Sequence, residues 1–212
     1  PFSFEVVPTE AVAEITEIPD RPVWIRILNS KTENIATIGR TIKLGESIRT
    51  EKNALVQITL RTGMVIRMEG DALLSIYGDR KIQLVRGKIV AWVPPNISTK
   101  IMLTDAIASV KNATVYIDST KTQQIMSLQG YIEVLSVDAS KPIAIKSGQS
   151  LIINKKLTNQ PKTLTQTELN EKFNKTKLLS GFNSRIGSQE AIASNLVTFE
   201  AIKKLKPIEE EK

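Results

Sequence analysis

The sequence predicts a mainly β protein: a stacked antiparallel β-sandwich or solenoid-like domain of many short strands, with a C-terminal α-helical tail. The core must rest on Ile, Val and Leu, because only 5% of the residues are aromatic, and β-branched side chains pack well on a pleated sheet. Short apolar runs are separated by Gly, Asn, Asp or Pro along most of the chain. Strands at this spacing are typical of a sandwich, a barrel or a solenoid-like stack rather than of βαβ units.

Residues 1–22 are expected to form an acidic arm ahead of the β domain. The first 20 residues contain three prolines, show no long periodic pattern and carry five acidic side chains without any Lys or Arg. The net charge of +7 for the whole chain therefore leaves +12 for residues 21–212. An acidic arm on a basic body is either a docking asymmetry or a solvated leader.

Residues 23–154 form the predicted β domain. The first strand signal covers residues 23–28, and Val56, Ile58 and Leu60 then alternate with polar neighbours. Alternation with a period of two indicates strands that turn one face to the core and the other to solvent. Further runs lie at 64–68, 73–77, 82–85, 88–93, 97–103, 106–110, 114–117, 125–128, 131–137, 143–145 and 151–153.

Residues 155–212 are expected to form a polar linker and a basic tail of two helices. Thr165 and Glu168 have capping-box spacing, which predicts a helix over residues 166–179. A second helix is predicted over residues 188–204, with Leu196 and Phe199 on its apolar face. Helices this short are marginal alone, so they must pack on the β domain or on a partner.

Five segments of the β region carry strand–turn–strand patterns centred on Gly or Thr-Gly, in the order 44–50, 54–68, 82–89, 124–134 and 143–149. Together they resemble the FecR-type periplasmic domain over a little over half of the chain. Three positions depart from the family pattern: Glu46 stands for an Asp, Thr62 for the Asp of an Asp-Gly turn, and Asn112 begins the step that is usually Gly-Thr. Asn tolerates the left-handed backbone that Gly would supply, so that turn can survive.

The resemblance implies a periplasmic, β-rich module used in protein–protein contact. In the FecR-type family this domain senses a loaded outer-membrane transporter and passes the signal across the inner membrane to a sigma factor. We therefore expect an exported protein, in a mature form whose leader has been removed. Its expected role is a regulator or an accessory, scaffold subunit of a cell-envelope assembly.

Several kinds of catalytic chemistry are excluded by the residue types. The chain has no Cys and no His, which removes thiolate nucleophiles, Cys/His zinc sites and imidazole acid–base catalysis. The one close acidic pair of the β region is Glu69 and Asp71 around Gly70, which suits either a solvated turn or a hard cation such as Ca²⁺. We expect no enzyme, no cofactor and no metal, although an enzyme acting through such an acid pair stays open.

Aromatic and apolar side chains supply the candidate partner contacts: Trp24, Trp92, Phe173, Leu196 and Phe199. The two tryptophans are core or interface anchors, or a platform for sugars, which keeps a carbohydrate- or cell-wall-binding domain as the alternative function. Nucleic acid is not expected, because the basic residues scatter over several strands instead of forming a patch. The basic tail could also contact a membrane surface peripherally.

Overall fold

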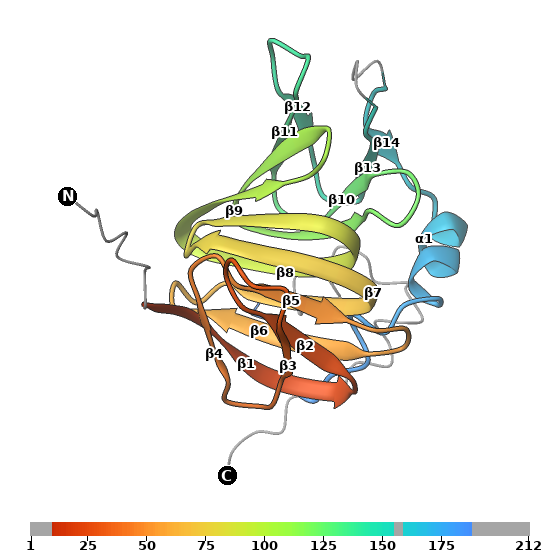
Figure 1. Ribbon diagram of the computed structural model, residues 1–212. Helices are drawn as coiled ribbons and strands as arrows, with labels where there is room; N and C mark the ends of the chain where they lie inside the picture. The colour runs from red at the N-terminus through yellow and green to blue at the C-terminus, as the bar shows by residue number, and fades with distance from the viewer. Residues whose placement is uncertain (1–9, 155–158, 188–212) are drawn as a thin grey trace, which may run out of the picture.

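The structure, a computed structural model, describes residues 10–154 and 159–187. These residues form one antiparallel sheet of fourteen strands and one short helix (Figure 1). Among them, no helix is long and apolar enough to cross a membrane. The mainly β prediction is confirmed. The elements are β1 (Ala11–Asp20), β2 (Val23–Arg26), β3 (Glu33–Ile35), β4 (Thr41–Lys43), β5 (Ser47–Thr50), β6 (Leu55–Leu60), β7 (Val65–Gly78), β8 (Lys81–Met102), β9 (Ala106–Asp118), β10 (Gln124–Gln129), β11 (Ile132–Ser136), β12 (Ile143–Ile145), β13 (Gln149–Ile152), β14 (Lys162–Thr163) and α1 (Gln166–Phe173).

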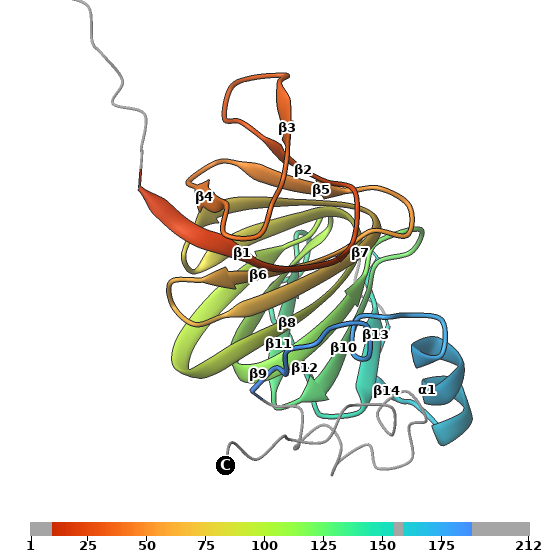
Figure 2. The same cartoon turned by 90° about the horizontal axis from the view of Figure 1, so that it is seen from below.

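Three long strands fold this sheet into two facing layers (Figures 1 and 2). The first part of β7 pairs with β6 and its second part pairs with β5. In the same way β9 pairs with β11 at its start and with β10 at its end. The register of β8 against β9 is broken between Val93 and Ser98, beside Pro94 and Pro95, as expected because proline donates no ladder hydrogen bond. Each long strand thus contributes to both layers.

The main hydrophobic core lies between the two layers. In β8, Ile89, Ala91 and Val93 belong to this core, while the intervening Val90 and Trp92 point out of the sandwich. All buried members of the core lie between Val12 and Ile153. Burying each Ile, Val or Leu stabilises the fold by roughly 1.5–3 kcal/mol. Among the described residues, this core is therefore built by the two layers without a contribution from the tail.

The predicted acidic arm is partly wrong, because residues 11–20 form strand β1 and pair with β4 and β6. Val12, Ile15 and Ile18 are buried in the core, while Glu14 and Glu17 face the other way. The register shifts after Ile15 and again after Glu17, so the apolar residues do not keep the period of two that a strand search requires. Residues 1–9 lie outside the described residues.

The first tail helix is confirmed at its start and shorter than predicted at its end. The capping box is present: the Glu168 amide donates to Thr165 Oγ1 over 3.3 Å, and the Thr165 amide donates to Glu168 Oε2 over 2.8 Å. The helix ends at Phe173 instead of residue 179. Leu178 and Leu179 are both buried, and the non-helical chain lets these neighbouring side chains reach the sheet. The predicted helix 188–204, with Leu196 and Phe199, lies outside the described residues.

Candidate functional site

One outer side of the sandwich is covered by the chain's own tail. We call residues 174–187 the strap; together with α1 it lies over the outward side chains of β1, β6, β7, β8, β9 and β10, which form the covered face (Figures 1 and 2). Tyr116 and Phe173 meet edge to face with ring centroids 5.2 Å apart. The second apolar cluster, between sheet and tail, consists of Val90, Tyr116, Met126, Leu128, Leu169, Phe173, Leu178, Leu179 and Ile186.

A buried arginine on β7 holds the strap. The Arg67 side chain has no exposed surface, and its guanidinium donates to the main-chain oxygens of Leu178 (3.1 Å), Leu179 (3.4 Å) and Ser184 (2.7 Å). Its Nε donates to Gln57 Oε1 over 2.9 Å. The same guanidinium lies 4.5 Å from the ring centroid of Phe182, a cation–π contact. One side chain therefore holds three carbonyls and one ring of the strap.

Two carboxylates hold the amides of the same segment. Glu17 accepts from the amides of Asn183 (2.5 Å) and Ser184 (3.2 Å), and from the Ser184 hydroxyl (2.7 Å). Glu69 accepts from the Lys177 amide over 2.9 Å. Hydrogen bonds with an ionised partner are about twice as strong as neutral ones. The sheet therefore binds both the donors and the acceptors of the strap's main chain.

Burial and these contacts change the ionisation of both groups. Burial lowers the pKa of Arg67 to about 10, although the charge of Glu17 acts in the opposite direction. Arg67 therefore keeps its charge at neutral pH. Burial raises the pKa of Glu17, but the bonds from Asn183 and Ser184 and the charge of Arg67 outweigh it, so the pKa lies below its ordinary value of 4.5.

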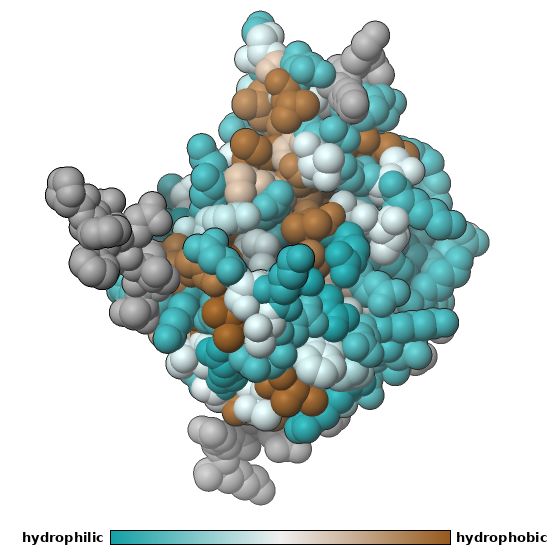
Figure 3. Space-filling model, in the orientation of Figure 1, coloured by the Kyte–Doolittle hydropathy of each residue, from teal (hydrophilic) through white to brown (hydrophobic). Residues whose placement is uncertain are grey.

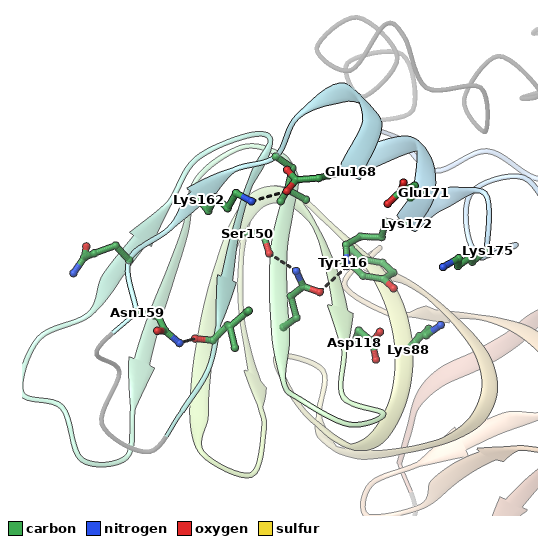
Figure 4. Close-up of a pocket in the computed structure, with 14 residues that line it drawn as sticks. Lys88, Tyr116, Asp118, Ser150, Asn159, Lys162, Glu168, Glu171, Lys172 and Lys175 are labelled. Carbon is green, nitrogen blue, oxygen red and sulfur yellow. Dashed lines mark hydrogen bonds and ion pairs between the residues drawn. The ribbon is translucent and has the colours of Figure 1, made fainter.

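A cavity of about 620 Å³ lies beside α1, between the helix and the ends of β9, β10 and β13 (Figure 4). Lys172 donates to Gln124 over 2.6 Å and lies 5.4 Å from the Tyr116 ring centroid. Burial lowers the pKa of Lys172, although the charge of Asp118 acts in the opposite direction. The lining of the cavity is mixed in charge, so the cavity selects neither anions nor cations by charge alone. Its basic residues are Lys88, Lys162, Lys172 and Lys175, and its acidic residues are Asp118, Glu168 and Glu171.

The outer side of the other layer carries no such cover in the described part of the chain. This open face consists of the outward side chains of β2, β3, β5, the second part of β7, both ends of β8, the first part of β9, β11 and β12. Figure 3 looks onto it and shows apolar side chains gathered over β11 and β12, with polar ones around them. Exposed apolar and aromatic side chains on it include Ile35, Tyr77, Leu135 and Val137.

The predicted contact residues are divided between the two faces. Trp24 lies on the open face, where its Nε1 donates to Glu51 over 3.0 Å and Arg49 lies 5.8 Å from the ring centroid. Trp92 lies on the covered face beside the end of the strap, at Gly187. Phe173 is buried against Tyr116. Of the three predicted contact residues that the structure describes, only Trp24 therefore lies where a partner could touch it without displacing the tail.

Of the acidic pair Glu69 and Asp71, only the Glu69 side chain forms a hydrogen bond to another part of the described chain, and this contact is structural. Glu69 bonds to the strap, and Asp71 is exposed. Within residues 10–154 and 159–187, no three acidic side chains are grouped in a way that could hold a metal ion.

Sequence reasoning missed Arg67 as the central residue of the covered face. Its signal is a charged side chain between two core residues, Ile66 and Met68, directly across the ladder from Gln57. An arginine at this position is also what a strand with one face in solvent would carry. The local pattern therefore does not show that the tail covers Arg67.

Comparison with known proteins supports the fold. No protein-family model matches the sequence, and no curated protein sequence matches it. Two crystal structures from Parabacteroides distasonis ATCC 8503, each described as a proposed anti-sigma factor, match with TM-scores of 0.51 and 0.50 at 14% identity. The matches cover 60% of this chain and 62% and 63% of those chains, less than two thirds of their length. At this identity the likeness concerns the fold alone.

Proposed function

We propose that this chain is a non-catalytic, regulatory protein-interaction module exported to the cell envelope, and that it docks its partner on the open face. One observation carries the proposal. The chain closes one side of its sandwich with its own strap and leaves exposed apolar side chains on the other. Exposed apolar patches on a folded domain commonly mark interaction sites.

The apolar part of the open face is a row across neighbouring strands. Met102 lies opposite Ile107, and Ile107 lies opposite Leu135. Leu135 is 40% exposed, and Val137, just beyond the end of β11, is 63% exposed. Side chains directly opposite each other across a ladder are in contact range, so the row forms a short continuous strip.

The charge around this strip defines the chemistry of the partner. Four basic side chains of the open face form no ion pair with another described residue: Lys81, Arg86, Lys100 and Lys111. They outnumber Glu133, the exposed carboxylate of β11 that lies in the same row as Lys100. A complementary surface carries carboxylates beside apolar side chains. The proposed occupant is therefore a protein with an acidic rim around an apolar centre.

Two independent arguments support a regulatory rather than a catalytic role. The chain lacks the Cys and His residues of the commonest catalytic sites. Its ordered Gly-centred segments resemble the FecR-type domain, and proteins described as proposed anti-sigma factors share its fold. A fold does not fix a function, so the envelope location and the regulatory role are proposals that need their own experiments.

The alternative, a carbohydrate- or cell-wall-binding domain, needs a bare aromatic ring. Trp92 is covered by the strap, and Trp24 already has a guanidinium near its ring. Titration of the tryptophan fluorescence with peptidoglycan fragments tests this alternative. A saturable change would favour it over the protein-docking proposal.

Partner capture with matched variants tests the docking proposal. Full-length tagged protein is used to capture partners from native envelopes, alongside Val137→Glu, Lys100→Glu and Lys175→Glu. The first two changes place a negative charge on the open face, while Lys175 lines the cavity on the other side. We expect a stoichiometric protein that is lost from the first two variants and retained by the third. Equal recovery by all three, or no stoichiometric protein, would contradict the proposal.

Export is tested separately by cell fractionation and by protease accessibility in spheroplasts. The proposal expects the protein in the periplasmic or envelope fraction and accessible to protease once the outer membrane is opened. A protein confined to the cytoplasmic fraction would remove the envelope part of the proposal.

A further inference from the structure

The covered face binds main-chain groups of the strap with side chains of the sheet. Side chains of the sheet contact six main-chain groups of the strap: three carbonyl oxygens through Arg67, two amides through Glu17 and one through Glu69. In the described part of the chain, no hydrogen bond joins a main-chain group of residues 174–187 to a main-chain group of a strand. The strap is therefore held as a peptide in a groove is held and does not extend the sheet as another strand.

Apolar pockets and close approaches add sequence selectivity. Leu178, Leu179, Phe182 and Ile186 are buried by 93% or more, being 0%, 5%, 7% and 4% exposed. A Cβ added at Gly181 would lie 2.7 Å from the Lys177 carbonyl oxygen and 3.1 Å from Leu55 Cδ1. Side chains larger than glycine do not fit there. The preferred peptide has the pattern Leu-Leu-x-Gly-Phe-x-Ser-x-Ile.

The sandwich does not depend on the strap for its core. Within residues 10–154 and 159–187, all buried residues of the main core lie at or before Ile153. The groups that the strap leaves behind include the charged side chains of Arg67 and Glu17, which water can solvate. Departure of the strap therefore exposes a face that is partly charged and leaves the two layers packed.

We propose that the covered face is a peptide-binding site for the strap sequence, occupied in this structure by the chain's own strap and open to exchange with the strap of a second copy. The recognised ligand is a peptide of the pattern above that adopts the turn of the strap, in which the Gly181 amide donates to the Lys177 carbonyl oxygen over 2.7 Å. The same complementarity that holds the strap in its own chain operates between copies, because the sequence is identical. Exchange of an identical element between protomers is a low-cost route to association.

Exchange is measured on the full chain, cut at one point. A protease site is inserted after Gln160, between β13 and β14, and the purified protein is cut so that both pieces remain together. Uniformly ¹⁵N-labelled and unlabelled cut proteins are mixed and followed by native mass spectrometry. We expect hybrid complexes, each with one labelled and one unlabelled piece. Absence of hybrids after prolonged mixing would overturn the proposal, as would unfolding of the sheet, seen by circular dichroism, whenever the tail piece leaves.

Recognition is then measured with a fluorescent peptide of residues 161–187 added to the cut protein. Ser184→Ala in the peptide removes a hydroxyl that bonds to Glu17 and should weaken binding about threefold to tenfold, while the exposed Ser180 gives a matched Ser180→Ala control with unchanged affinity. In the protein, Arg67→Lys keeps the charge but loses the planar fork and should weaken binding at least about tenfold. Arg86→Lys on the open face should change nothing. Equal affinities across all of these variants would contradict the proposed site.

Discussion

The guanidinium of Arg67 donates to the main-chain oxygen of Ser184 over 2.7 Å, across 117 residues of sequence. This contact joins the middle of the β domain to the end of the described chain. Around it, Gln57 contacts both Arg67 and Ser184, and Glu17 contacts Ser184, so a polar network lies on the outer side of the sheet. It accounts for how a tail with one short helix stays in place.

Arg67→Met should destabilise the protein by about 2–3 kcal/mol, because it removes the donor to three strap carbonyls while filling a similar volume. The free energy of unfolding, measured in urea, checks this. Arg86→Met is the control, because Arg86 is exposed and forms no ion pair with a described residue. A loss no larger than the control's would show that the strap is held by its apolar side chains alone.

Gly187→Ala should lift the end of the strap from Trp92. A Cβ at this position would lie 2.7 Å from Trp92 Cη2, closer than carbon atoms approach. In a Trp24→Phe background, the emission of Trp92 should shift to longer wavelength as water reaches the ring. Gly78→Ala serves as the control, since its Cβ would meet only the Arg80 amide at 4.0 Å. Identical spectra for the two variants would contradict the contact.

Acid should weaken the strap through Glu17. Its pKa in the folded protein lies below the ordinary 4.5, because the bonds from Asn183 and Ser184 outweigh burial. Glu17 therefore stabilises the fold fully above the unfolded pKa, and this contribution is lost as the pH falls below about 4.5 and through the lower folded value. The difference in unfolding free energy between wild type and Glu17→Gln should shrink over that range. A difference that is constant with pH would rule out the carboxylate's role.

Neighbouring residues of β11 should respond oppositely to truncation. Val134 has no exposed surface and lies in the core, while Leu135 points out of the open face. Val134→Ala should cost about 2 kcal/mol, and Leu135→Ala should change stability by less than about 0.5 kcal/mol. Thermal or urea unfolding of both variants checks this. A large loss for Leu135→Ala would mean that its side chain serves folding and not partner contact.

The strands were predictable where the alternation is regular, as at Val56, Ile58 and Leu60, which all lie in the core. Strand β1 was not predictable from alternation. Its buried residues Val12, Ile15 and Ile18 are three positions apart, because the register of the strand shifts between them. The helix start at Thr165 was predictable from its cap, since capping is a local interaction. Its end was not, because Leu178 and Leu179 are placed by contacts with distant strands.

The covered face could not be predicted from local sequence. The partners of Arg67 are contributed by residues more than 100 positions away, and long-range contacts leave no periodic signal near Arg67 itself. The open face was not predicted either. The sequence indicated a strand within residues 131–137 without assigning Leu135 to a face, and the prediction that the tail packs on the β domain or on a partner did not say which face it would cover.

Site-specific photo-cross-linking in the native envelope tests the central claim most directly. A photoreactive residue replaces Val137 on the open face in one protein and Glu171, exposed on α1 at the covered side, in another. The account predicts one stoichiometric protein partner, other than a second copy of this chain, that is cross-linked from position 137 and not from position 171. Cross-linking of that partner from position 171 alone, or equally from both positions, would contradict the assignment of the open face as the docking surface.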